Sequence, residues 1–477
     1  MIIGLSTYKA DGSKFREFTF PKEEKIKGTF LERVAALKHE MLPQSGNKPT
    51  VVILGAGPAG LIRAITSILN GNPTQIIEKR SESAPRRENT VLLETETVYQ
   101  LLSLGVYQYL AEHNMIFPAK MFKTDHILKS IEVRLGDLEV ALKVLIKELQ
   151  PTQEIDYGKR LCEIDSRREK LTLTIESADQ QRTIIENVGI LVNAEGSRST
   201  TNQLLGICRI KVLPEKPAIA VIFKDKRPSI NGFNSLFRYI GISIAYIAKT
   251  VYYHAIFIFK FIFCKSFRRE CLGVFLKTPG QVYLGCGFSP EINERIQQFK
   301  QEIANKAKAL DQASTQKERA RCQESLRAAK KRYRSFLKMR SNLGLCAVNF
   351  INLFMQPLGE KMTTKHLSFA RCEAIDIGAD RATTFALKFN ESAILLAGDA
   401  AATVDPSTGL GCNTALQSNE QFANFIKDES DLDPINKQSL DEKIDHYQKG
   451  INHYVEFIHE QSKLSREVLE NLIVGNY

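Results

Sequence analysis

The sequence predicts an α/β protein whose parallel sheet is assembled from two distant parts of the chain. Thr50–Leu54 is a short apolar, β-branched run, typical of a strand buried on both faces of a parallel sheet. It leads directly into Gly55-Ala56-Gly57-Pro58-Ala59-Gly60. A second apolar run, Ala393–Ala397, ends in Gly398-Asp399 near the other end of the chain. The two strand-to-glycine junctions point to one dinucleotide and predict a Rossmann-like domain that binds it.

The glycines of the first junction have the spacing of a dinucleotide-binding turn. Gly55 permits the tight turn, Gly57 lets a pyrophosphate approach the backbone, and Gly60 allows the following helix to pack on the strand. That helix is predicted over Leu61–Leu69, and its N-terminal N–H groups would face the phosphates.

The next predicted strand ends at Glu78, 18 residues after Gly60. An acid at this place accepts hydrogen bonds from the adenosine ribose, and it favours a free 2′-hydroxyl, as in FAD or NAD. The alternative is a glycine-rich turn in an unrelated α/β domain. The strand, the helix and the terminal acid together favour nucleotide binding.

The second junction narrows the nucleotide to FAD. A carboxylate at Asp399 can accept hydrogen bonds from a polyol such as ribitol. The stretch Pro406–Asn413 is rich in small residues and opens a helix through Ala415–Ile426. The N–H groups of this stretch could face the edge of a flavin ring, where negative charge builds on reduction.

These segments resemble the flavoprotein monooxygenases with the p-hydroxybenzoate hydroxylase fold, also called class A. The resemblance rests on Gly55–Gly60 with Glu78-Lys79-Arg80, the helix around Arg134, Asn193–Ser199 and Gly398–Asn413. It implies an FAD-binding domain with an inserted β-sheet substrate domain, and NADPH or NADH as electron donor. It also implies a flavin hydroperoxide that hydroxylates a substrate or releases hydrogen peroxide.

The resemblance assigns roles to residues of this chain. The glycine turn would hold the FAD pyrophosphate and Glu78 the adenosine ribose, with Arg80 beside the adenosine. Arg134 would lie near the pyrophosphate or the ribitol, and Asp399 would bind the ribitol. The expected isoalloxazine neighbours are Pro406, Gly409 and Gly411. The full expected cofactor set is Gly55, Gly57, Pro58, Ala59, Gly60, Glu78, Lys79, Arg80, Arg87, Asn89, Arg134, Glu195, Gly196, Gly398, Asp399, Pro406, Gly409, Gly411 and Asn413.

Within this fold, the sequence also has a patchy resemblance to the MICAL flavin domain. It is carried by Arg86-Arg87-Glu88-Asn89 with the apolar run after it, and by Ile131–Arg134 leading into Leu142–Leu145. It implies a protein substrate, such as a methionine of a cytoskeletal partner. Arg86, Arg87 and Asn89 are the candidates to approach the flavin or its substrate. The alternative for either arginine is a solvated loop charge.

The sequence departs from the family pattern at several places. Glu195-Gly196 stands where the family has Asp-Gly, which puts nicotinamide handling in question. Ala402 replaces a frequent histidine, and Asp405 replaces a frequent proline. The chain has no tryptophan, so the aromatic substrate wall of MICAL enzymes has no direct counterpart and tryptophan-dependent halogenase motifs are excluded.

The expected organisation has five parts and two insertions. The parts are an N-terminal helical extension (1–48), the FAD-binding domain (49–205 and 370–430), a middle domain (206–369) and a helical C-terminal extension (431–477). The first insertion, 237–263, is apolar with a basic residue every 11 positions, which suits a helix lying in a membrane surface. The alternative is a helix packed over the flavin cleft.

The second insertion, 290–340, has apolar residues spaced by threes and fours, which predicts a helical hairpin. Residues 317–340 hold ten Lys or Arg against two Glu. This surface, or 237–269, is expected to meet an acidic protein substrate or an anionic membrane. A solvated helix face is the alternative.

Composition limits the remaining classes of function. The net charge of +11 comes with no nucleic-acid-binding motif, so a nucleic-acid partner is the least expected. The nine cysteines form no C-x-x-C pair, which indicates reduced thiols in the cytoplasm and no metal site. No signal peptide is recognised. The alternatives that stay open are a small aromatic or lipid hydroxylase, a reductase, and a binding module with a structural flavin.

Overall fold

The computed structural model describes residues 28–43, 48–116, 130–225, 273–278, 281–287, 290–355, 367–405, 410–427 and 438–474. Only the backbone is described at 215–225, 273–278, 281–287, 290–293, 338–355, 367–377 and 465–474. The described part of the chain divides into two compact units: residues 28–214 with 378–464, and residues 215–377 with 465–474. The apolar insertion expected at 237–263 lies outside the described residues.

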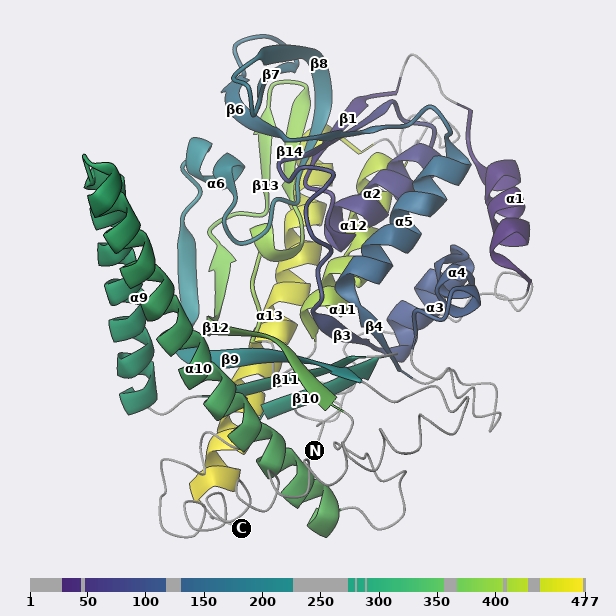
Figure 1. Ribbon diagram of the computed structural model, residues 1–477. Coiled ribbons are helices and arrows are strands. Elements are labelled where there is room, and N and C mark those ends of the chain that lie inside the picture. Colours follow the sequence, from purple (N-terminus) through teal and green to yellow (C-terminus); the bar gives the residue numbers. More distant parts are fainter. Residues whose placement is uncertain are drawn as a thin grey trace, which may run out of the picture. The chain divides into compact units, whose positions relative to one another are not determined.

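The larger unit is built on an eight-stranded sheet (Figure 1). Its strands are β1 (Thr50–Leu54), β2 (Thr74–Glu78), β5 (Ile155–Tyr157), β6 (Lys159–Asp165), β7 (Leu171–Ser177), β8 (Arg182–Asn193), β13 (Ala386–Phe389) and β14 (Ser392–Leu396). Strands β14, β8, β1, β2 and β5 are parallel neighbours in this order. Strand β13 pairs antiparallel with β14, and β6 and β7 form an antiparallel meander on β8. The predicted sheet from two distant chain segments is therefore confirmed.

The apolar run of β1 is explained by burial on both sides. Val51 and Ile53 pack in one core with the helices, whereas Val52 and Leu54 pack in a second core with the meander. The helices of this unit are α1 (Phe30–Glu40), α2 (Pro58–Leu69), α3 (Thr95–Ser103), α4 (Val106–Glu112), α5 (Leu135–Leu149), α6 (Thr200–Leu204), α11 (Leu410–Gln417), α12 (Asn419–Ile426) and much of α13 (Leu440–Val474). Helices α2 and α5 lie side by side (Figure 1). One face of the sheet thus packs on helices and the other on strands.

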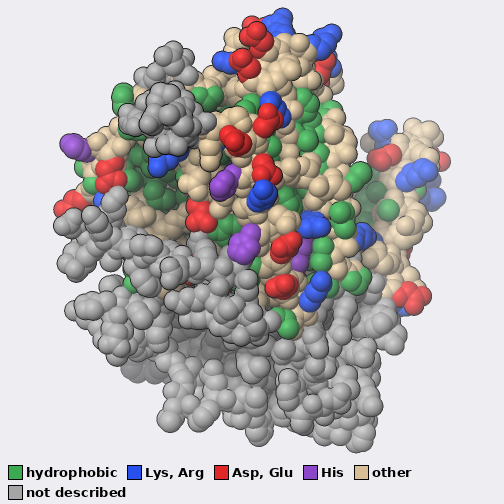
Figure 2. Space-filling model, turned by 180° about the vertical axis from the view of Figure 1, so that it is seen from behind, with side chains coloured by type: hydrophobic (Ala, Val, Ile, Leu, Met, Phe, Trp, Pro, Cys, Tyr) green, Lys and Arg blue, Asp and Glu red, His purple; other side chains and the backbone are tan. Residues whose placement is uncertain are grey.

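The meander carries its polar residues as cross-strand ion pairs. Arg160 of β6 pairs with Glu176 of β7 at 2.7 Å, and Arg168 pairs with Glu186 of β8 at 2.8 Å. Figure 2 shows acidic and basic side chains mixed at the top of the view, where this meander lies. Exposed pairs of this kind add little stability, so the meander is held mainly by its apolar face.

A two-stranded ribbon of β3 (Thr90–Leu93) and β4 (Ile131–Arg134) leads into α5. The expectation of a helix around Arg134 is wrong at this residue, which is the last of β4 and the N-cap of α5. Ile131 and Val133 are buried while Glu132 and Arg134 are partly exposed. This period of two is that of a strand. The helix that the sequence predicts begins one residue later.

The smaller unit holds a four-stranded sheet in the order β10-β11-β9-β12. The strands are β9 (Arg209–Asp225), β10 (Gly273–Thr278), β11 (Gln281–Gly287) and β12 (Leu367–Ala382). A helical hairpin follows, made of α9 (Pro290–Gln312) and α10 (Gln316–Met355). The ring of Phe299 lies 5.7 Å from that of Tyr333 and 5.5 Å from that of Phe336, which joins the two helices. A β-sheet domain that carries helices is what the sequence predicts.

None of the helices in the described ranges has both the length and the apolar character needed to cross a membrane.

Candidate functional site

The carboxyl ends of four parallel strands meet at one edge of the larger sheet. Leu54 at the end of β1 lies beside Ile77 of β2 and Asn193 of β8, and Leu396 of β14 lies on the other side of Asn193. In open α/β sheets, ligands bind outside the carboxyl ends of the strands. The segments that follow these four strands hold most of the residues predicted to bind the cofactor.

The glycine turn joins β1 to α2 by a very close approach of backbone. Gly55 has φ +103°, and a Cβ there would lie 2.4 Å from the carbonyl oxygen of Ala194. A Cβ at Gly60 would lie 1.9 Å from the carbonyl oxygen of Gly55. Both glycines are therefore required by packing alone.

Gly57 is different, because packing does not require it. A Cβ there would meet nothing closer than Arg87 Nη1 at 3.8 Å and Glu139 Oε1 at 3.9 Å. Its φ of −83° is open to any residue. The missing side chain leaves room in front of the helix, which is what a pyrophosphate needs to approach the backbone.

The N-terminus of α2 opens into this room. Gly57 is the N-cap, Pro58 has no N–H, and the first helical hydrogen bond runs from Leu61 N to the Gly57 carbonyl at 2.9 Å. The N–H groups of Ala59 and Gly60 thus have no acceptor within the helix. Together with the guanidinium of Arg87, they make this end of the turn attractive to an anion.

Glu78 at the end of β2 is a buried acceptor beside the turn. Its Oε2 accepts from Ala56 N at 2.8 Å and from Arg80 Nη2 at 3.1 Å, and its Oε1 accepts from Arg80 N at 2.9 Å. Burial acts to raise the pKa of Glu78, but the hydrogen bonds from Arg80 and Ala56 outweigh it and the pKa lies below its ordinary value. The carboxylate is ionised at neutral pH, and Oε1 keeps a lone pair for a ribose hydroxyl.

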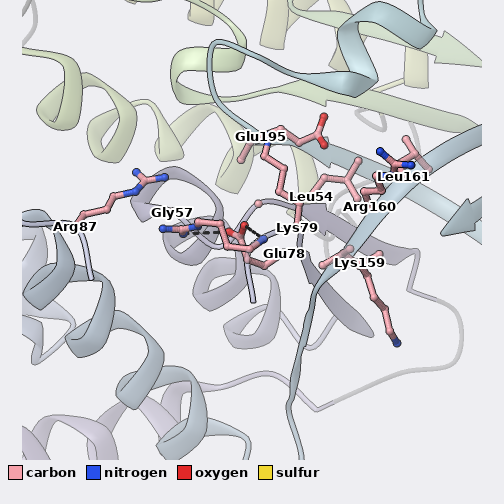
Figure 3. Close-up of a pocket in the computed structure, with 13 residues that line it drawn as sticks. Leu54, Gly57, Glu78, Lys79, Arg87, Lys159, Arg160, Leu161 and Glu195 are labelled. Atoms are coloured by element: carbon pink, nitrogen blue, oxygen red, sulfur yellow. Dashed lines mark hydrogen bonds and ion pairs between the residues drawn. The ribbon is translucent and has the colours of Figure 1, made fainter. Parts of the chain in front are cut away.

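A pocket lies between these residues (Figure 3). Its lining includes seven of the predicted cofactor residues: Gly55, Gly57, Glu78, Lys79, Arg80, Arg87 and Glu195. It also includes Lys159, Arg160 and Leu161 of β6, which sequence reasoning missed. No motif marks these three, because they reach the pocket only through the position of β6 in the sheet. In Figure 3 the side chain of Lys159 points away from Glu78.

Glu195 stands where the family pattern has aspartate, and its carboxylate accepts hydrogen bonds from other residues of this protein. Its Oε2 accepts from Ser199 Oγ at 2.9 Å and from Thr201 N at 2.9 Å, at the first turn of α6. The extra methylene lets the acid reach this helix start. The following Gly196 has φ +88° and open space where its Cβ would be, so the turn between β8 and α6 stays accessible.

Asp399 follows β14 and is an exposed residue, although the protein atoms around its carboxyl desolvate it and raise its pKa above the ordinary value, against the pull of Arg87 and Arg209. Within the described part of the chain, no hydrogen bond or ion pair reaches that carboxylate, although Arg209 Nη1 donates to the Asp399 carbonyl at 3.0 Å. The preceding Gly398 has φ +55°, and a Cβ there would lie 2.8 Å from the Cβ of Ala59. The end of β14 is thereby fixed against the start of α2, with a carboxylate left for a polyol.

The start of α11 is tied to the end of β3 by Asn413. Its Oδ1 accepts from Glu94 N at 2.8 Å, and its Nδ2 donates to the Leu92 carbonyl at 2.8 Å. Burial raises the pKa of the neighbouring Cys412 thiol to about 12, so this cysteine stays protonated and suits packing. Gly411 lies against Val404. Pro406 and Gly409 lie outside the described residues.

The remaining predicted residues are spread around the turn. Arg87 lines the pocket, whereas Arg86 and Asn89 are exposed and do not line it. Arg134 forms an ion pair with Asp137 at 2.5 Å. Among the side chains that the structure describes, no group of three or more His, Cys, Asp or Glu is arranged to hold a metal ion.

These residues fit FAD. The open space at Gly57 and the start of α2 suit a pyrophosphate, Glu78 suits a ribose, and Asp399 suits a ribitol chain. They come from three strand ends along one sheet edge, in the order in which an extended dinucleotide would meet them.

Comparison with known proteins agrees at the level of fold. No protein-family model matches this chain, and no curated protein matches its sequence. A flavoprotein/dehydrogenase from Cytophaga hutchinsonii has a similar structure, with a TM-score of 0.54 and 14% identity over 88% of this chain and 87% of that one. p-Nitrophenol 4-monooxygenase from Pseudomonas putida has a TM-score of 0.50 and 14% identity over 89% of this chain and 97% of that one.

The flavin-dependent halogenase CmlS has a TM-score of 0.52 and 14% identity over 90% of this chain. This chain spans 63% of the halogenase. The chain has the p-hydroxybenzoate hydroxylase-type flavoprotein fold. The predicted fold is thus confirmed, and the finer resemblance to the MICAL flavin domain stays a prediction.

Proposed function

We propose that this protein is an FAD-dependent oxidoreductase. The observation that carries the proposal is the convergence of the open Gly57 turn, the Glu78 carboxylate and the Asp399 carboxylate on one sheet edge. The shared fold supports it, because that fold occurs in a flavin-dependent halogenase and in p-nitrophenol 4-monooxygenase.

Each part of the site has a role in holding FAD. The start of α2 and the guanidinium of Arg87 would bind the pyrophosphate, Glu78 the adenosine ribose, and Asp399 the ribitol. A bound flavin would supply the redox chemistry, with a reduced nicotinamide as the proposed electron donor. The protein supplies the orientation of the dinucleotide along the sheet edge.

The finer proposal is a monooxygenase that uses NADPH or NADH. It is supported by the family resemblance. Such chemistry needs no nucleophilic side chain. Cys412 on α11 has a pKa raised to about 12 by burial and is unsuited to act as a nucleophile.

Absorbance spectroscopy tests the proposal directly. The purified protein is titrated with FAD, and its spectrum is recorded before and after anaerobic addition of NADPH and of NADH. We expect flavin bands that bleach with one of the two donors. Bands that persist with both would favour a structural flavin. A folded protein that takes up no FAD would refute the central claim.

The partner that we propose is an acidic protein substrate that docks on α10. Arg327, Lys330, Lys331 and Arg334 are exposed, share one helix face, and form no ion pair in the described part of the chain. Four cations left without acids attract an anionic surface. The basic flank predicted at 237–269 lies outside the described residues.

Charge reversal tests this docking surface. Arg327→Glu with Lys331→Glu should abolish salt-sensitive binding of an acidic protein, and should leave FAD affinity unchanged. The matched control, Lys300→Glu with Lys308→Glu on α9, should bind as wild type. Binding of the wild type to vesicles with anionic lipid, and to no acidic protein, would show a membrane role in its place.

A further inference from the structure

Glu139 on α5 is a buried carboxylate that faces the glycine turn. The residue is 4% exposed, and its Oε1 lies 3.9 Å from the place of a Cβ on Gly57. This oxygen has no hydrogen-bond partner. A buried carboxylate oxygen that accepts no hydrogen bond costs free energy, unless it carries a proton that a bound group can accept.

Two arginines of the pocket lie close to the carboxyl group of Glu139. Arg87 Nε lies 3.4 Å from Oε1, and Arg80 Nη1 lies 3.7 Å from Oε2. Both contacts are long for charge-assisted hydrogen bonds, and both arginine side chains stay partly exposed. These are the cations that a pyrophosphate at the turn would need.

The other charges around Glu139 are Lys143 on α5 and Glu78 on β2. Burial, helped by the Glu78 charge, raises the pKa of Glu139, and the cations Arg87, Arg80 and Lys143 act in the opposite direction without cancelling the rise. The carboxyl therefore takes up a proton more readily than an ordinary glutamate.

A phosphate that reaches the Gly57 turn would bring negative charge close to Glu139 Oε1. An ionised carboxylate there would repel it and would compete for Arg80 and Arg87. A protonated carboxyl carries no charge and can donate a hydrogen bond to a phosphate oxygen. It would also leave Arg87 and the Nη1 of Arg80 to the phosphates, while Arg80 Nη2 stays bonded to Glu78.

We propose that Glu139 is a further cofactor-binding residue, which contacts the dinucleotide phosphates in its protonated form. The inference rests on the proposed binding of FAD. Binding then takes up as much as one proton from solvent for each FAD, the fraction by which Glu139 was ionised before, and release of FAD returns it. No covalent bond to the cofactor forms or breaks.

The test is the dissociation constant of FAD as a function of pH, from the quenching of flavin fluorescence by the apoprotein. Across the pH range in which the protein stays folded, the wild-type constant should rise with pH, by up to tenfold per pH unit above the pKa of Glu139. Glu139→Gln, a neutral donor of the same shape, should bind tightly and with no such slope. Glu148→Gln on the same helix should behave as wild type.

Proton uptake gives a second measurement that needs no variant. Calorimetry of FAD binding in buffers of different ionisation enthalpy should show up to one proton taken up per FAD in the wild type, and none in Glu139→Gln. FAD binding with no pH slope and no proton uptake would overturn the inference and leave the proposed function standing. Failure of the folded wild type to bind FAD at any pH would overturn both.

Discussion

Arg63 on α2 donates a hydrogen bond of 3.2 Å to the backbone carbonyl of Ala415 on α11, across 352 positions of sequence. It also donates to Ser418 Oγ at 3.2 Å, just beyond the end of α11. The guanidinium is completely buried, and burial lowers its pKa. Its charge lies at the carboxyl end of α11, where the helix dipole favours a cation. One side chain thus joins the two helices whose amino ends border the proposed FAD site.

Arg63→Met should reduce both stability and FAD affinity. The buried acceptors on α11 would lose their donor, and we expect the free energy of unfolding to fall by about 1–3 kcal/mol. FAD should bind more weakly because α11 is no longer fixed to α2. Urea denaturation and FAD titration measure the two effects.

The matched control is Arg33→Met on α1, since Arg33 is also buried and donates through Nε and Nη2 to the Ser103 carbonyl. It should lose a similar stability and keep its FAD affinity. Equal FAD affinity in both variants would show that Arg63 has a structural role only.

Gly57→Ala should separate folding from cofactor binding. A Cβ at Gly57 meets no atom closer than 3.8 Å. Replacing this glycine should change stability by less than about 1 kcal/mol, because the gain from a less flexible unfolded chain is offset by the poorer N-cap that alanine makes. The new methyl group would occupy the path of the pyrophosphate, so FAD affinity should fall by at least about tenfold. Gly60→Ala should instead destabilise the fold, because its Cβ would lie 1.9 Å from a carbonyl oxygen. If Gly57→Ala bound FAD normally, the phosphates would have to lie elsewhere.

Glu94 should make the protein less stable as pH rises from about 4.5 to about 7. Burial, with help from Glu96, raises its pKa from 4.5 to about 7. Between these values the folded state holds a proton that the unfolded state has released, so the free energy of unfolding falls with pH, by up to about 3 kcal/mol. Above pH 7 this loss is complete. Denaturation of Glu94→Gln over this range should lack the decline, while Glu82→Gln, at an exposed site, should retain it.

His459 should make the protein less stable as pH falls, which is opposite to the effect of Glu94. Its Nε2 lies 3.1 Å from the Thr403 carbonyl oxygen, and burial lowers its pKa below 6.5. The folded state therefore keeps the ring neutral, and its contribution is present above about pH 6.5 and lost as pH falls toward the lowered pKa. His459→Gln should reduce this acid sensitivity in thermal denaturation. His446→Gln, an exposed change on the same helix, should leave it intact; a loss there too would argue against His459.

The features that local sequence predicts best are those with a local physical cause. The turn at Gly55 and Gly60 needs glycine because backbone atoms approach within 2.4 Å or less of the missing Cβ. The apolar run of β1 predicts a strand buried on both faces, and the two cores bear this out. Arg134 shows the limit of this reasoning. The sequence predicts a helix at this residue because a helical pattern follows it, but Arg134 is the last residue of the short strand β4.

The sequence by itself determined the fold class, the two strand-to-glycine junctions and the kind of cofactor to expect, because periodicity and turn chemistry are written in neighbouring residues. Only the tertiary structure decided which side chains share the site. Arg160 reaches the pocket through strand order, Glu195 turns to cap α6, and Glu139 comes to face Gly57 from another helix. These relationships depend on packing between segments far apart in the chain, where spacing in the sequence carries no information about distance.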